Sequence, residues 1–128
     1  MAARYQLKVV TEFASAHTLR DYPGACSRMH GHNWKVELEA VSTQLDDVGM
    51  GIDFKLMKNA ANEVGDQLDH RYLNDLEPFK EINPTAENIA AYMYKEISVR
   101  INSDTVKVIA LTIWETERAC VRYSEENE

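Results

Sequence analysis

The chain has 128 residues, 45% apolar and 27% charged, and a formal net charge of −7, which argues against nucleic acid as a partner because that needs a basic surface. No apolar run reaches the roughly 18 residues of a transmembrane helix, so no membrane partner is expected. Two cysteines are too few for a disulfide framework, and the first residues alternate like a strand rather than a signal peptide, so we expect one cytoplasmic domain over residues 1–128.

Two strands are predicted in the first third of the chain, because apolar and polar side chains alternate there. The first covers residues 4–14 and the second covers residues 32–42. The segment between them contains Asp, Pro and Gly, so it is predicted to be a loop.

Two helices are predicted in the middle of the chain. Over residues 54–68 the apolar spacing becomes helical, and the expected buried stripe is Phe54, Met57, Ala61, Val64 and Leu68. A polar, irregular segment follows and ends at Pro84. Thr85 has the side chain of an N-cap and Glu87 lies in the first turn, which predicts a second helix up to residue 101.

Two further strands are predicted at residues 105–114 and 119–123, before an acidic tail, 124–128, that we expect to be frayed. The order ββααββ predicts an α+β fold, with an antiparallel sheet and both helices on one face. The third strand is apolar on both of its alternating faces. The sheet would then expose an apolar face opposite the helices, so we expect an oligomer that covers it.

Three of the four histidines are predicted to meet at one end of the sheet. His30 and His32 are two residues apart at the start of a strand, so they share a face. His17 lies just beyond the first strand, whose end adjoins the start of the second if the two are antiparallel. Three imidazoles without a fourth protein ligand are typical of a catalytic zinc site, although Co²⁺, Ni²⁺ and Fe²⁺ also suit imidazole. The alternative is three separate polar or structural histidines.

Cys26 precedes His30 by four residues in the loop CSRMHGH, and two roles are open to it. It could be the fourth ligand of a closed structural metal site. It could instead remain free beside the metal as a base or nucleophile, because a thiolate is suited to both tasks. Spacing alone does not decide between these roles.

Two carboxylates are further candidates. Asp69 directly precedes His70, and in a loop it could hold that imidazole in one tautomer; alternatively, His70 is only a helix-terminal residue. Glu115 ends an apolar strand, where a carboxylate is costly unless it is paired or faces a ligand, such as a planar heterocycle with two N–H donors. The alternative for Glu115 is an exposed ion pair with Arg118.

Six segments together resemble the 6-pyruvoyl/6-carboxy-tetrahydropterin synthase family, in the family's order along nearly the whole chain. They are FASAH, CSRMHGH, GIDF, LDHRYLN, PTAEN and WETERACVRY. The cysteine followed by three residues and then HGH is most similar to the branch that makes 6-carboxy-5,6,7,8-tetrahydropterin for queuosine. HGHN followed by an aromatic residue is also found in the 6-pyruvoyl branch, so that product remains the alternative.

The resemblance implies a zinc-dependent lyase that acts on 7,8-dihydroneopterin triphosphate and releases triphosphate and acetaldehyde. It implies Zn²⁺ on His17, His30 and His32, Cys26 as the base, and Asp69 with His70 as a proton-transfer pair. It also implies that Glu115 anchors the pterin ring and that Thr85 faces the pterin pocket.

The same resemblance implies the tunnelling fold, in which the sheets of a trimer form a barrel. Two trimers would stack into a hexamer, with active sites between subunits. From a different functional class, the rival hypothesis is a non-catalytic, zinc-stabilised oligomeric module. In that module Cys26 would bind the metal.

Overall fold

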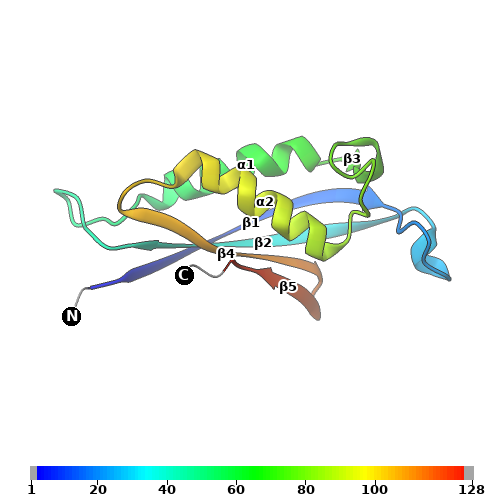
Figure 1. The fold of residues 1–128 in the computed structure, drawn as a ribbon, viewed down its shortest axis with the longest axis horizontal. Coiled ribbons are helices and arrows are strands. Elements are labelled where there is room, and N and C mark those ends of the chain that lie inside the picture. Colours follow the sequence, from blue (N-terminus) through cyan, green and yellow to red (C-terminus); the bar gives the residue numbers. More distant parts are fainter. Residues whose placement is uncertain (1–2, 126–128) are drawn as a thin grey trace.

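The computed structural model describes residues 3–125, except for the side chain of Cys26. A single five-stranded sheet carries both helices on one face, in the strand order β3-β1-β2-β4-β5 (Figure 1). Of the expected tail, residues 126–128 lie outside the described part. The elements are β1 (Tyr5–His17), the 3₁₀ turn η1 (Ala25–Ser27), β2 (His30–Ser42), α1 (Phe54–Leu68), β3 (Arg71–Tyr72), the 3₁₀ turn η2 (Leu73–Asp75), α2 (Ala86–Ile101), β4 (Val106–Thr116) and β5 (Ala119–Tyr123).

The β1–β2 pair positions the predicted site. It is antiparallel, and its register is regular from Tyr5 opposite Ser42 to His17 opposite His30. Both strands extend further toward this end than alternation predicted, because the pairing continues through the small residues Ala14, Ser15 and Ala16. His17 is therefore the last residue of a strand and not the first of a loop.

Both helices begin and end where the sequence predicted. Asp53 caps α1 by accepting a hydrogen bond from the Lys55 N–H at 2.8 Å. The predicted stripe is buried except at Phe54, which is 54% exposed and lines a surface hollow with Tyr5. The prediction for Phe54 was wrong because the first helical turn lies beside this open hollow and not over the core.

The strand β4 differs from its prediction in the direction of its side chains. Its pairing with β2 shifts by one residue between Glu39 and Ala40, which leaves Ile109 without a partner in that register. This β-bulge reverses the alternation. The two halves of the strand thereby send their apolar residues to the same, helix-covered core: Val106, Val108, Leu111 and Ile113.

The sheet face opposite the helices is therefore polar over much of its area, and the predicted apolar uncovered face was wrong. Lys8 lies 3.1 Å from Glu37, and the Arg122 guanidinium lies 3.0 Å from Glu39 on this face. The Trp114 indole N–H donates to Glu37 at 2.6 Å. Burial of apolar area on this face is no longer an argument for an oligomer.

The polar segment after α1 was predicted to be irregular, but it adds the two-residue strand β3. This strand is parallel to β1 and pairs with Ser15 and Ala16. Among the described residues, the same edge of β1 has no strand partner from Tyr5 to Phe13. Neither described helix has the length and apolar composition needed to cross a membrane.

Candidate functional site

Three imidazoles converge at the end of the sheet that carries η1, as the spacing predicted. His17 ends β1, His30 begins β2 directly opposite, and His32 follows on the same face of β2. One ring nitrogen from each residue lies within 4.8 Å of the other two. His17 is fully buried, whereas His30 and His32 are partly exposed, so the cluster opens toward solvent on the β2 side.

Backbone carbonyls determine which nitrogens face the centre. His17 Nδ1 lies 2.7 Å from the Pro84 oxygen, and His30 Nδ1 lies 2.7 Å from the Arg28 oxygen. A carbonyl oxygen can only accept, so in the neutral rings each Nδ1 carries the proton and each Nε2 carries a lone pair. Carbonyl partners of this kind are the usual outer support of metal-binding histidines.

The inward-facing nitrogens fit a bound cation. His17 Nε2 and His30 Nε2 are 2.9 Å apart, so two lone pairs face each other across this gap. His32 Nε2 is buried and has no hydrogen-bond partner within the described part of the chain. Three neutral imidazole donors with this arrangement suit Zn²⁺ or a similar divalent ion and leave a coordination position for another group.

The surroundings of His17 and His32 lower the pKa of both imidazoles. Burial is the largest influence on both His17 and His32, and it lowers the pKa of each imidazole below the ordinary 6.5. The Pro84 carbonyl and Glu115 oppose this effect at His17, and Glu115 opposes it at His32, but the pKa remains lowered. The two rings are therefore neutral at pH 7 and can donate lone pairs.

Glu115 points toward the three-histidine cluster from β4. Its Oε2 lies 3.6 Å from His17 Nε2 and 3.7 Å from His32 Nε2, and the side chain is 34% exposed. It is therefore not engaged with Arg118, which was the alternative from the sequence. The carboxylate is both partly accessible and close to the cluster, so it can contact a ligand bound there.

Asp69 and His70 form a fixed pair at the end of α1. His70 Nδ1 lies 2.9 Å from Asp69 Oδ2, while Asp69 Oδ1 accepts the Ala14 backbone N–H at 2.8 Å. The bond from Ala14, followed by the contact with His70, lowers the pKa of the Asp69 carboxyl. His70 has the unusual backbone angle φ 56°, and its N–H also donates to the Ala14 carbonyl. The imidazole is thus oriented and largely exposed.

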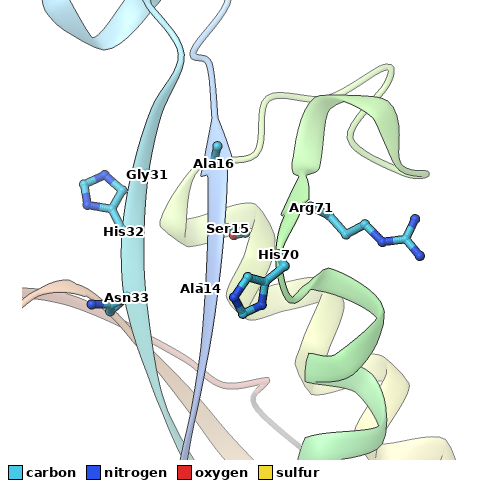
Figure 2. Close-up of a pocket in the computed structure, with 8 residues that line it drawn as sticks. All are labelled: Ala14, Ser15, Ala16, Gly31, His32, Asn33, His70 and Arg71. Atoms are coloured by element: carbon cyan, nitrogen blue, oxygen red, sulfur yellow. The ribbon is translucent and has the colours of Figure 1, made fainter.

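His70 of this pair and His32 of the histidine cluster line one cavity from opposite sides of the β1–β2 pair (Figure 2). Ala14, Ala16, Gly31, His32, His70 and Arg71 contribute to one open cavity of about 450 Å³. Within it, the His70 ring lies on the β3 side of β1, whereas the His32 ring lies on the far side of β2 (Figure 2). Two strands separate the rings.

The structure describes the side chain of Thr85 but not that of Cys26. Cys26 lies in η1, between the ends of β1 and β2, but its side chain is outside the described structure. Thr85 is the N-cap of α2, and its hydroxyl accepts the Asn88 N–H at 3.1 Å, as the sequence predicted. Sequence patterns did not identify the carbonyls of Arg28 and Pro84 as histidine partners, because any residue type can supply a carbonyl.

The fold and the three-histidine centre define an α+β protein of the tunnelling-fold class with a candidate metal site at one end of its sheet. The model of the family 6-pyruvoyl tetrahydropterin synthase matches residues 6–126, so the chain belongs to this family, as the sequence motifs predicted.

Relatives agree with this assignment. The 6-carboxy-5,6,7,8-tetrahydropterin synthase of Rickettsia typhi is 30% identical over 128 residues, covering 86% of this chain and 93% of that protein. The Bacillus subtilis protein of the same name is 31% identical over 104 residues, covering 77% and 69% respectively. The structure of Caenorhabditis elegans 6-pyruvoyl tetrahydropterin synthase matches with a TM-score of 0.85 at 27% identity, and the match covers 98% of both chains.

Proposed function

We propose that this protein is a zinc-dependent lyase that makes 6-carboxy-5,6,7,8-tetrahydropterin. The substrate is 7,8-dihydroneopterin triphosphate; one water is consumed, and triphosphate and acetaldehyde are released. The convergence of one ring nitrogen from each of three histidines carries the proposal, because such a group could hold a metal ion and leave a coordination position open. The names of the bacterial relatives support this product. A cytoplasmic role in the queuosine precursor pathway is part of the proposal and rests on the sequence motifs alone.

Each polar group has a role in the proposed reaction. Zn²⁺ held by the three histidines would supply Lewis acidity toward the side-chain oxygens of the substrate. Cys26, as a thiolate, removes a proton from the side-chain carbon. His70 exchanges protons with the side-chain oxygens and is oriented by Asp69, whose lowered pKa keeps it ionised.

Two residues are proposed to bind the pterin ring. The Glu115 carboxylate can accept two parallel N–H donors, and its partial exposure beside the cluster supports such a contact. Thr85 would face the pterin pocket. Its hydroxyl already accepts a backbone N–H, so it retains its own proton for donation to a ligand.

We further propose that a second copy of the chain completes each active site. His70 and His32 line one open cavity, but their rings lie on opposite sides of the β1–β2 pair (Figure 2), which supports a site that a neighbouring copy completes. The unpaired edge of β1 and the edge strand β5 could pair between copies. The proposed assembly is a trimeric barrel that stacks into a hexamer.

Two other functions predict different products. A 6-pyruvoyl tetrahydropterin synthase would eliminate triphosphate and keep the side-chain carbons. The similarity to the structure of the Caenorhabditis elegans enzyme of that name supports this alternative. A non-catalytic, zinc-stabilised module would produce neither product.

One assay separates these functions. The zinc-loaded protein is incubated with 7,8-dihydroneopterin triphosphate, and the products are identified by mass spectrometry. We expect 6-carboxytetrahydropterin and acetaldehyde in equal amounts. A pyruvoyl product without acetaldehyde would establish the first alternative, and unchanged substrate would favour the second. A His30→Ala variant is the control for metal-independent breakdown.

A further inference from the structure

Two asparagine side chains continue the edge of β1 beyond its last residue. Asn74 accepts the Thr18 backbone N–H and donates to the Thr18 carbonyl, both at 2.9 Å. Asn83 makes the same two bonds with Arg20, also at 2.9 Å. A primary amide offers a donor and an acceptor side by side, as the N–H and C=O of one residue in an antiparallel strand do. The two side chains therefore take the place of a neighbouring strand and hold the backbone of Thr18 and Arg20.

Asn83 also belongs to the segment that supports α2. Its own backbone carbonyl accepts a hydrogen bond from the Asn88 side chain at 2.8 Å, and Asn88 lies in the first turn of that helix. The Arg20 side chain returns to the same segment, where its guanidinium donates to the carbonyls of Phe79 and Ile82. The segment before α2 is thus bound to Arg20 twice, through the side chain of Asn83 and through the side chain of Arg20 itself.

Pro84, the residue after Asn83, contacts the candidate metal centre through its carbonyl. Pro84 is buried, its ring fixes one backbone angle, and its carbonyl oxygen accepts from His17 Nδ1 at 2.7 Å. His17 is fully buried, and this is the bond that directs its Nε2 toward His30. A displacement of the Pro84 carbonyl would release the His17 ring or exchange its tautomer.

We propose that Asn83 is a positioning residue for the metal centre. By its two hydrogen bonds to the Arg20 backbone, Asn83 holds the Pro84 carbonyl against His17 Nδ1. Asn83 does not touch a metal ligand and acts only through Pro84. The inference shares one assumption with the proposed function, namely that the three histidines bind a metal ion. The hydrogen bond on which it is built can be measured without one.

The test uses Asn83→Ala in the full-length protein with two measurements. Zn²⁺ affinity is determined by competition with a chromophoric chelator, and the His17 tautomer by long-range ¹H–¹⁵N spectra of the metal-free protein. We expect weaker Zn²⁺ binding, by at most the about 10–100-fold that the loss of a ligand's own hydrogen-bond partner costs, because Asn83 acts through Pro84. We also expect His17 to lose its single Nδ1–H form.

Asn102→Ala is the matched control, because Asn102 also bonds a backbone group, the Val108 N–H at 2.8 Å, but at the other end of α2. It should keep the wild-type tautomer and affinity. If Asn83→Ala does not fold, Asn83→Asp replaces it. The aspartate keeps the acceptor for the Arg20 N–H but loses the donor, so a smaller change in the same direction is expected.

The outcomes are separable from those of the proposed function. Wild-type affinity together with an unchanged His17 tautomer in the folded Asn83 variant would overturn the inference. If the wild-type protein bound no Zn²⁺, the proposed function would fail, and the tautomer would still decide whether Asn83 orients His17. An equal loss of affinity in Asn102→Ala would mean that general destabilisation was responsible, which also overturns the inference.

Discussion

The histidine cluster is most informative at the level of single nitrogen atoms. Two lone pairs only 2.9 Å apart, on His17 and His30, repel one another unless a cation or a proton lies between them. The two carbonyl partners hold the rings in this arrangement. Both rings thus direct Nε2 toward the same centre, which is what a preorganised binding site requires.

Replacement of one ligand should abolish stable metal binding. We expect His30→Ala to lose its zinc during dialysis against a weak chelator, because two imidazoles do not make a tetrahedral site with enough donors. Metal content measured by plasma mass spectrometry would fall from about one ion per chain to near zero. His70→Ala is the control and should retain its metal; loss from both variants would contradict the assignment of the ligands.

Cys26→Ala distinguishes the catalytic from the structural interpretation of the centre. Because three imidazoles suffice for the metal, the variant should keep its zinc and its melting temperature. Turnover should fall by about 100-fold or more, the effect of removing a general base. Loss of zinc together with unfolding would show instead that the thiol completes a closed structural site.

Asp69→Asn should weaken catalysis and change the acid stability of the protein. The pKa of the Asp69 carboxyl is lowered in the fold, so its contribution to stability is present above the unfolded-state pKa of about 3.9 and is lost as the pH falls through the lower, folded-state pKa. The difference in melting temperature between wild type and variant should therefore be greatest near pH 7 and shrink below about pH 4. A difference that does not change with pH would contradict this.

Among the elements, α2 connects stability to the site. Its N-cap Thr85 satisfies one backbone N–H, and the residue before it supplies the carbonyl for His17. The start of the helix therefore has a structural role in addition to any contact with substrate. The same segment also contains Asn83, whose side chain binds the Arg20 backbone.

Variants of Thr85 can separate the two roles. Thr85→Ala should lower the free energy of unfolding by about 1 kcal/mol, because the cap is lost, and Thr85→Ser should restore it. Chemical denaturation measures this change. If the hydroxyl also binds the pterin, then in stabilising buffer the alanine variant should show a raised KM while serine does not. Equal stability of all three proteins would contradict the capping role.

The sequence predicted the elements well and the direction of some side chains poorly. Helix bounds follow from local signals, namely the helical apolar spacing over residues 54–68 and the N-cap Thr85. The histidine cluster follows from a two-residue spacing on one strand plus antiparallel pairing. The bulge at Ile109 could not be predicted, because it depends on how β4 pairs with β2. The orientation of Glu115 likewise depends on the cluster beside it, which only the folded chain forms.

At the scale of the whole molecule, the two halves of the candidate site are fixed to different sides of the β1–β2 pair. Asp69 is tied to β1 through the Ala14 N–H, and its other carboxylate oxygen holds His70 Nδ1, so the pair keeps the His70 ring on the β3 side of β1. Association of copies can bring the His70 of one chain to the metal centre of another.

Mixed oligomers test this arrangement. His30→Ala lacks the metal centre but keeps the Asp69–His70 pair, and His70→Ala has the reverse defect. If sites form between subunits, co-expression of the two inactive variants should restore activity. About one quarter of the sites would combine two intact halves, since each half is intact in half of the chains. Each variant expressed alone is the control. If every site were built within one chain, the mixed protein would be as inactive as its components, although native mass spectrometry would still show mixed oligomers.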